Sequence, residues 1–290
     1  MRHTRLGRRV ALGTIRCMIR ATSSVDELTR VELFGFDFVD DVSVEPIADI
    51  IVGSRPDEVA FPPVVVTPNT DLLLQLSSDS DDRLRTFFSN AWCVLPDGQP
   101  IVWASRLLKA PLRFRLTGSD LFAHLWPRLV DAGAPVFVLA PNDAVSDGLR
   151  AGHPQAVTIV APMIDQSDDA GLATLASDCV AQIVTAEARV AVLSLGHPKD
   201  SLIASLIIEQ LAATPERIPF VLCVGGSAEM YLGLRKRAPM WVQRCSAEWL
   251  YRFAQEPRRL FHRYFVRDIG FIPLVWREHR ARRRGAASTP

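Results

Sequence analysis

Short apolar runs that alternate with segments of helical length constrain the fold of this chain more than any other feature. The runs cover Val64–Thr67, Trp92–Leu95, Pro135–Ala140, Ala156–Val160, Arg189–Gly196 and Pro219–Gly226. Continuous apolar strands separated by helices are typical of a parallel sheet that is covered on both faces. The sequence therefore predicts an α/β fold with a mostly parallel, Rossmann-like sheet and helices on both faces.

Small, polar and acidic residues follow four of these apolar runs. They are Thr67 with Asn69, Asp97 with Gly98, Gly196 to Asp200, and Gly225 to Ser227. Ligands of parallel sheets bind beyond the carboxyl ends of the strands, so these four loops are candidates for one site. Such residues are also ordinary turn formers, which is enough to explain any one of the loops. Four such loops at the same predicted edge favour a binding site.

Asp97 is the candidate catalytic residue of this edge. It lies in the stretch LPDGQP, directly after an apolar run, and the neighbouring Gly98 leaves room for a substrate to approach. A carboxylate in this place can act as a general base on an alcohol. The same spacing also fits a turn aspartate without a catalytic role.

None of the motifs that indicate a bound metal or nucleotide cofactor is found in the sequence. No P-loop, no dinucleotide-binding glycine motif after a strand and no nucleophile elbow is present. The six histidines do not cluster at metal-ligand spacing. The stretch Asp79–Asp82 contains a DxD pattern, but its serine-rich surroundings favour a solvated connector. We therefore expect no metal site and no cofactor.

Charge is distributed unevenly along the chain. The net charge is +1, yet residues 235–284 carry a net +10, and the first twenty residues contain six arginines and no acid. Residues 21–234 therefore carry about −15. This pattern predicts a basic leader over residues 1–30, an α/β catalytic domain over residues 31–234 and an appendage over residues 235–290. An acidic body with basic ends suggests that the ends meet an anionic partner.

The appendage mixes arginines with large aromatic residues. They are interleaved in Glu248–Phe265, where two helical segments are expected on either side of Pro257. Such a mixture suits an anionic membrane surface, and it also suits single-stranded nucleic acid, against which the acidic body argues. The apolar run Ile269–Trp276 is too short to span a membrane, which takes about twenty residues. The final segment, Arg280–Pro290, is expected to fray.

The cysteines and the N-terminal segment indicate a cytoplasmic protein. The five cysteines are odd in number and show no CxxC or zinc-finger spacing, which favours buried, reduced thiols. Arg16 and Arg20 interrupt the apolar part of the N-terminal segment, so a cleaved signal peptide is not expected.

Longer motifs stand in a fixed order along the chain. The strongest are the RAP, EWLYR and EPRR-x-x-x-RY elements within Val224–Tyr264. Supporting elements are TPN at Thr67–Asn69, PDGQPIVWASR at Pro96–Arg106, LTGSDLF at Leu116–Phe122 and LGHPK at Leu195–Lys199. Together they resemble the WecG/TagA/CpsF glycosyltransferases, from about residue 64 to residue 264.

This resemblance implies an inverting, metal-independent transfer of a hexose-type sugar from a UDP-sugar donor to a polyprenyl-diphosphate-linked saccharide, in the synthesis of bacterial surface polymers or exopolysaccharides. It implies that Asp97 is the base and that the enzyme is peripheral on the inner face of the cell membrane. The candidate substrate-binding residues are Thr67, Asn69, Arg106, Asp200, Gly225 and Glu229. The candidate residues for the lipid diphosphate and the anionic membrane are Arg237, Arg252, Arg259 and Arg263.

The sequence departs from the family pattern at several positions. Asp200 and Ser201 stand where the family usually has Gln and Glu, and Glu229 stands where it usually has Asp. A different sugar specificity is therefore open. So is a second interpretation, a catalytically inactive sugar-nucleotide or lipid-binding partner of a polysaccharide assembly complex. Nucleic acid is not expected as a partner, and the sequence leaves open whether the chain forms a homo-oligomer.

Overall fold

The computed structural model describes residues 28–77, 82–214, 216–235 and 268–287 of the 290-residue chain. The stretch Asp79–Asp81 and the two helices expected around Pro257 lie outside the described residues, as does nearly all of the predicted leader. The same holds for the four arginines predicted to meet the lipid diphosphate or the membrane, namely Arg237, Arg252, Arg259 and Arg263.

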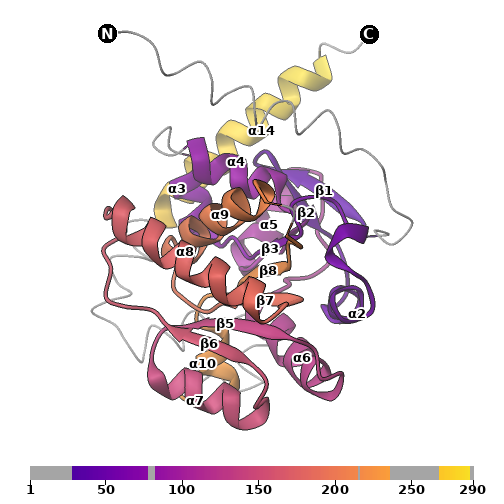
Figure 1. Cartoon of the computed structure of the whole chain (residues 1–290). Helices are drawn as coiled ribbons and strands as arrows, with labels where there is room; N and C mark the ends of the chain where they lie inside the picture. The colour runs from indigo at the N-terminus through magenta and orange to yellow at the C-terminus, as the bar shows by residue number, and fades with distance from the viewer. Residues whose placement is uncertain (1–27, 78–81, 215, 236–267, 288–290) are drawn as a thin grey trace, which may run out of the picture.

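One eight-stranded sheet forms the centre of the described structure (Figure 1). The strands are β1 (Arg30–Leu33), β2 (Phe36–Val39), β3 (Val64–Val66), β4 (Cys93–Val94), β5 (Val136–Ala140), β6 (Val157–Val160), β7 (Val190–Leu193) and β8 (Phe220–Cys223). Their order in the sheet is β1-β2-β4-β3-β8-β7-β5-β6. β1 and β2 are antiparallel, and all other neighbours are parallel. The predicted α/β fold with a mostly parallel sheet is confirmed.

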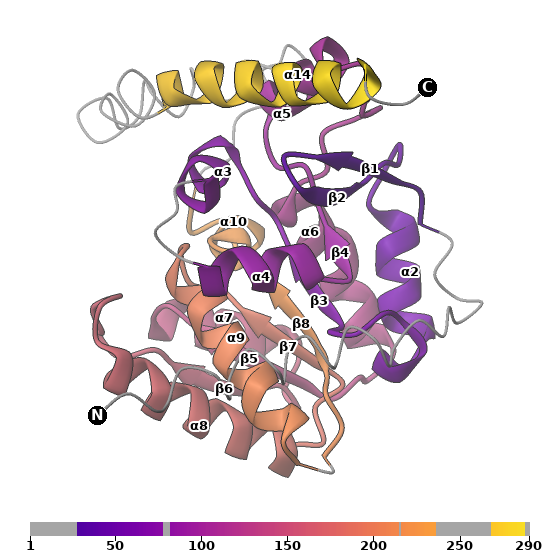
Figure 2. The same ribbon diagram turned by 90° about the horizontal axis from the view of Figure 1, so that it is seen from above.

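Helices cover both faces of the sheet (Figure 2). One face carries α3 (Thr70–Ser77), α4 (Asp82–Asn90), α5 (Gln99–Leu107), α8 (Asp169–Thr185) and α9 (Lys199–Ala212). The other carries α2 (Glu45–Gly53), α6 (Gly118–Asp131), α7 (Asp143–Gly152) and α10 (Ser227–Tyr231). Short 3₁₀ turns lie at Pro56–Glu58 and Asp268–Gly270.

Successive residues of each central strand pack into two different cores. In β8, Val221 and Cys223 belong to the core that contains α8 and α9, whereas Phe220 and Leu222 belong to the core that contains α6 and α7. Side chains alternate between the faces of a strand, and here both faces are buried. The strands therefore appear in the sequence as continuous apolar runs, which is why they could be predicted.

The hairpin β1–β2 was not predicted, because charged residues interrupt the apolar residues of both strands. Each strand has four residues, and in β2 the exposed Asp37 lies among three buried residues, Phe36, Phe38 and Val39. The turn consists of Phe34 and Gly35, which both have positive φ angles, of 57° and 80°. A phenylalanine is an unusual residue for this conformation, so the turn lacks the Asn-Gly or Asp-Gly signal that marks many hairpins.

Helix α14 (Phe271–Ala287) is the part of the predicted appendage that the structure describes in most detail. It packs against α3 and the β1–β2 hairpin (Figures 1 and 2), with the rings of Phe34 and Phe271 5.5 Å apart. Arg282 pairs with Glu278 at 2.8 Å and donates to the carbonyl oxygen of Glu32. The helix runs to Ala287, so the expectation of fraying was wrong for residues 280–287, whereas residues 288–290 lie outside the described residues. The predicted domain boundaries at residues 30 and 235 stay predictions.

Candidate active site

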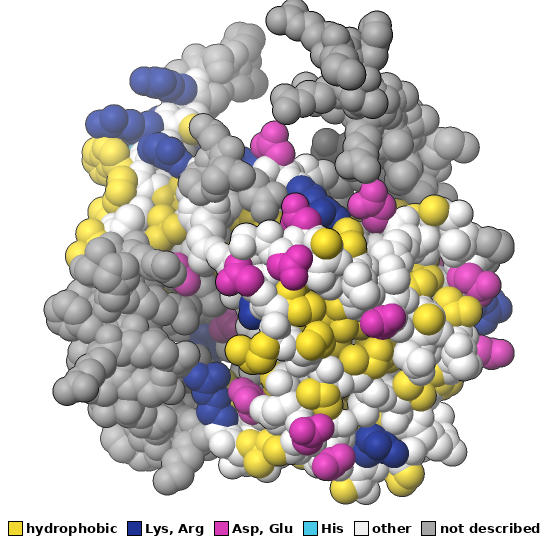
Figure 3. Space-filling model, turned by 60° about the vertical axis from the view of Figure 1, so that its left-hand side comes forward, with side chains coloured by type: hydrophobic (Ala, Val, Ile, Leu, Met, Phe, Trp, Pro, Cys, Tyr) yellow, Lys and Arg dark blue, Asp and Glu magenta, His cyan; other side chains and the backbone are white. Residues whose placement is uncertain are grey.

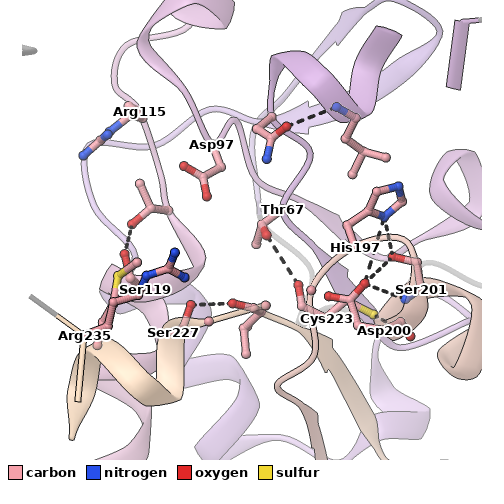
Figure 4. Close-up of a pocket in the computed structure, with 18 of the residues that line it drawn as sticks. Thr67, Asp97, Arg115, Ser119, His197, Asp200, Ser201, Cys223, Ser227 and Arg235 are labelled. Carbon is pink, nitrogen blue, oxygen red and sulfur yellow. Dashed lines mark hydrogen bonds and ion pairs between the residues drawn. The ribbon is translucent and has the colours of Figure 1, made fainter. Parts of the chain in front are cut away.

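The carboxyl ends of β3, β4, β7 and β8 lie at one edge of the sheet, as the sequence predicted. β3 has β4, its successor in the chain, on one side and β8, the last strand, on the other. The loops that follow these strands therefore separate and leave a crevice, which is the usual ligand position in such sheets. Together with the segment that leads into α6, they enclose a cavity of about 220 Å³ (Figure 4).

Backbone hydrogen bonds hold the loops after β3 and β4 against each other. The amide of Asp97 donates to the carbonyl oxygen of Pro68 at 3.2 Å. Gly98, the next residue, has a φ angle of 149° and is the N-cap of α5. A side chain is strained at this angle, so the glycine allows the chain to turn into α5 directly after Asp97.

Asp97 is half-buried and lines the cavity. Its carboxylate lies in the space between Arg115 and Thr67 (Figure 4). The position is accessible to a ligand, and it is fixed by the short loop between β4 and α5. A carboxylate so placed can accept a proton from a hydroxyl group bound in the cavity.

Thr67 and Asn69 line the same cavity, and each is fixed by a hydrogen bond. The hydroxyl of Thr67 donates to the carbonyl oxygen of Cys223 at 3.4 Å, which ties the end of β3 to the end of β8. The Asn69 Oδ1 accepts from the amide of Leu72 at 3.1 Å and so caps the first turn of α3. Both residues therefore have a structural role in addition to any ligand contact.

A buried polar cluster forms the side of the cavity between β7 and β8. Ser201 donates to Asp200 Oδ1 twice, from its amide at 2.7 Å and from its hydroxyl at 3.0 Å. The Nδ1 of His197 lies 3.3 Å from the Ser201 hydroxyl and 4.0 Å from Asp200 Oδ1 (Figure 4). The thiol of Cys223 lies 3.9 Å from the carbonyl oxygen of Asp200.

Burial dominates the electrostatics of this cluster. Only 3% of Asp200 is exposed. Burial raises the pKa of Asp200 to about 7, although hydrogen bonds from Ser201 and the backbone of Gly225 favour the ionised form. Burial and the nearby Asp200 charge also raise the pKa of the Cys223 thiol. Cys223 is therefore a protonated, structural thiol.

Two arginines line the opposite part of the cavity. Arg115 lies just before α6, and Arg235 follows α10 (Figure 4). Glu229 lies 3.8 Å from the guanidinium of Arg235. Thr117, Ser119 and Ser227 add hydroxyl groups to the lining of the cavity. The adjacent Arg113 does not line the cavity, because it pairs with Asp40 at 3.0 Å.

The structure brings together most, but not all, of the predicted residues that it describes. Thr67, Asn69, Asp97, Asp200 and Gly225 line the cavity. Glu229 contacts Arg235, as described above, but is not among the lining residues. Arg106 is exposed on the last turn of α5 and is not among them either.

Further lining residues were not named individually as substrate-binding candidates, although Gly196, His197, Gly226 and Ser227 lie in the four candidate loops. They are Leu72, Phe88, Arg115, Thr117, Ser119, Gly196, His197, Ser201, Cys223, Val224, Gly226, Ser227, Met230 and Arg235. The motifs LTGSDLF and LGHPK contain several of them, so a signal was present. The sequence offers Arg106, Arg113 and Arg115 after the Asp97 turn, and Arg235 at the start of the appendage, as groups that could neutralise a phosphate. It does not show that, of the first three, only Arg115 lines the cavity.

The fold and the cavity define a class of protein, an α/β protein whose cavity at the carboxyl edge of the sheet contains a carboxylate and two guanidinium groups. The glycosyl transferase WecG/TagA/CpsF family matches residues 31–285, so the chain belongs to this family and is a glycosyltransferase. Among the described residues, no group of three or more His, Cys, Asp and Glu side chains is arranged to hold a metal ion. Within the same ranges, no helix is long and apolar enough to cross a membrane.

Two curated relatives carry the same name, N-acetylglucosaminyldiphosphoundecaprenol N-acetyl-beta-D-mannosaminyltransferase. The protein from Bacillus spizizenii (strain W23) is 27% identical over 196 residues, which is 67% of this chain and 72% of the relative. The protein from Bacillus subtilis (strain 168) is 27% identical over 213 residues, which is 68% of this chain and 73% of the relative. Their name describes transfer to a sugar carried on a lipid diphosphate.

Proposed function

We propose that this chain transfers a hexose-type sugar, with inversion, from a UDP-sugar to a polyprenyl-diphosphate-linked saccharide during the synthesis of a bacterial surface polymer or exopolysaccharide. The observation that carries the proposal is the position of Asp97 in a cavity that also contains two arginines. The names of the two relatives support a lipid-diphosphate-linked acceptor.

Asp97 acts as the general base in this proposal. Its carboxylate takes the proton of the acceptor hydroxyl, and the oxygen attacks C1 of the donor sugar from the face opposite the leaving group. The bond between C1 and the phosphate oxygen breaks, and UDP leaves with the electron pair. The configuration at C1 inverts because attack and departure take place on opposite faces. Guanidinium groups can stabilise the charge that develops on the leaving diphosphate.

The experiment that tests this activity is UDP release from a panel of UDP-sugars with a short-chain lipid-diphosphate sugar as acceptor. Release that depends on the acceptor supports the transferase. The second candidate is a catalytically inactive binding partner, which the buried Asp200–Ser201 pair favours because it departs from the family pattern. Binding of UDP-sugar without acceptor-dependent release, across the whole panel, would establish that second candidate.

Helix α14 supports a position at the inner face of the cell membrane. Its inner side is buried through Phe271, Leu274 and Val275, whereas Ile272 and Trp276 are 70% and 56% exposed. Apolar side chains and arginines gather on α14, at the upper left of Figure 3. A helix with exposed apolar residues and arginines suits an anionic bilayer surface.

The membrane contact is tested by replacing Ile272 and Trp276 together with alanine and measuring co-sedimentation with anionic liposomes. We expect weaker binding, and we expect binding of the unaltered protein to weaken at high salt. Met163→Ala is the matched control, because Met163 is fully exposed and follows β6, away from α14. Equal binding of the double variant and the control would remove α14 from the membrane contact.

A further inference from the structure

The cavity has two walls of opposite character (Figure 4). One wall, here called the basic wall, contains Arg115 and Arg235. The other, here called the acidic wall, contains His197, Asp200 and Ser201. In Figure 4, Asp97 and Thr67 lie between the two walls.

The basic wall is the place for a diphosphate. Among the described residues, two arginines and no lysine line the cavity, namely Arg115 and Arg235. A guanidinium can form paired, charge-assisted hydrogen bonds with phosphate oxygens. The contribution of the α6 N-terminus is smaller, because Asp120 already occupies its first turn and accepts from the Thr117 hydroxyl at 2.6 Å. The two arginines therefore supply most of the positive charge.

The acidic wall excludes a second anion. Asp200 is almost fully buried, and its Oδ1 already accepts two hydrogen bonds from Ser201. Once Asp200 is ionised, a ligand carboxylate or phosphate beside it would meet a like charge in surroundings that screen it poorly. Neutral hydroxyl groups do not meet this repulsion, and His197 and Ser201 offer them hydrogen-bonding partners. This wall therefore suits an uncharged sugar.

We propose that the two walls orient the UDP-sugar, with its diphosphate against Arg115 and Arg235 and an uncharged sugar ring against His197, Asp200 and Ser201. This inference rests on the proposed function. It places C1 of the sugar between the walls, near Asp97, where the acceptor hydroxyl must lose its proton. Asp200 is then a specificity residue that acts through its charge and through Ser201, and it is not a catalytic residue.

The basic wall is tested by isothermal titration of Arg115→Gln and Arg235→Gln with UDP and with uridine. We expect each variant to bind UDP roughly 10- to 100-fold more weakly, with uridine binding unchanged, because the lost hydrogen bonds are charged. Arg150→Gln is the matched control, since Arg150 is exposed near the end of α7 and does not line the cavity. Unchanged UDP affinity in both arginine variants would overturn this half of the inference.

The acidic wall is tested with UDP-glucose and UDP-glucuronic acid, which differ only in the group at C6. At pH 8, where Asp200 is mostly ionised, we expect the unaltered protein to bind UDP-glucose at least about tenfold more tightly than UDP-glucuronic acid. We expect Asp200→Asn to reduce that affinity ratio without weakening the binding of UDP itself. If the unaltered protein binds UDP-glucose and UDP-glucuronic acid about equally well, the acidic wall does not select an uncharged sugar, whether or not the Asn variant folds. A ratio that Asp200→Asn leaves unchanged, in a folded variant, overturns the assignment as well.

The proposed function and this inference can fail separately. If the protein transfers sugar to a lipid-linked acceptor but shows neither binding pattern, the orientation is wrong and the function stands. If both binding patterns are found but no UDP-sugar supports transfer, the function is wrong and the orientation stands. A protein that binds no UDP at all overturns both.

Discussion

Asp97 and Asp200 lie at the same edge of the same sheet, yet their surroundings differ. Asp97 is half-buried in the short loop after β4, and its carboxylate lies in the open part of the cavity. Asp200 is buried at the start of α9, accepts hydrogen bonds from Ser201 and has a pKa raised to about 7. An acidic residue that directly follows a strand lies at the site because of the topology. Burial and local hydrogen bonds then decide whether its carboxyl group can exchange protons with a substrate.

The largest difference between the two acids is expected in transfer activity. Asp97→Asn keeps the size of the side chain but removes the base, so we expect transfer to fall roughly 10²- to 10⁴-fold while UDP binding is kept. The measurement is acceptor-dependent UDP release together with titration of UDP. Asp143→Asn is a matched control, because Asp143 follows β5 at the same edge of the sheet but does not line the cavity. Near-normal transfer by Asp97→Asn would remove Asp97 from the catalytic step.

The sequence predicted the central sheet because its buried strands are continuous apolar runs. It did not predict β1, β2 or α2, which lie before Val64. The edge hairpin is short, has charged residues in both strands, and turns at Phe34 and Gly35 without a typical hairpin signal. Local patterns are strong where both faces of a strand are buried and weak at the edge of a sheet.

The candidate site was predicted in part for a similar reason. Thr67, Asp97 and Asp200 follow central strands, so their meeting at one edge follows from the topology. Arg115 reaches the cavity from the segment before α6, which does not follow directly on a strand. Its partner in the basic wall, Arg235, lies where the predicted appendage begins. Contacts of this kind depend on tertiary packing, which spacing in the sequence does not reveal.

A second difference between the two acids is expected in the pH dependence of stability. The folded-state pKa of Asp200 is raised, to about 7, above its ordinary value of 3.8. Between these values the folded protein binds more protons than the unfolded protein, so the contribution of Asp200 to stability falls as pH rises from 4 to 7. Asp200→Asn removes the carboxyl group and with it this loss of stability. We expect the free energy of unfolding of the variant, minus that of the unaltered protein, to increase from pH 4 to pH 8 by up to roughly 4 kcal/mol.

Urea denaturation at pH 4, 6 and 8 measures this effect. His197, Ser201 and Cys223 face Asp200 and remain in both proteins, so the difference between the two curves isolates the carboxyl group. Asp165→Asn provides a contrast, because hydrogen bonds from Ser167 lower the pKa of the exposed Asp165 below its ordinary value of 3.8. Its effect on stability therefore falls mostly below pH 4, and its difference curve should be nearly flat from pH 4 to pH 8. If the curves of the unaltered protein and Asp200→Asn run parallel over this range, Asp200 does not carry a raised pKa.

The smallest expected effect concerns the hydroxyl of Ser201, which donates to Asp200 Oδ1 at 3.0 Å. Ser201→Ala should cost about 1 kcal/mol of stability, as for a typical hydrogen bond. The cost should be larger at pH 8 than at pH 5, because this hydrogen bond favours the ionised form of Asp200 and the carboxyl group is mostly ionised only above its pKa.

A double-mutant cycle with Asp200→Asn separates this charge effect from simple loss of packing. At pH 8 we expect Ser201→Ala to cost less in the Asn background than in the unaltered protein, with a coupling energy of about 0.5–1 kcal/mol. Ser146→Ala is the control, since the buried Ser146 bonds to the hydroxyl of Thr158 at 2.8 Å and not to Asp200. Its cost should be the same in both backgrounds. If Ser201→Ala lowers the free energy of unfolding equally in both backgrounds, Ser201 stabilises the acidic wall by packing. Its hydroxyl then does not stabilise the charge of Asp200.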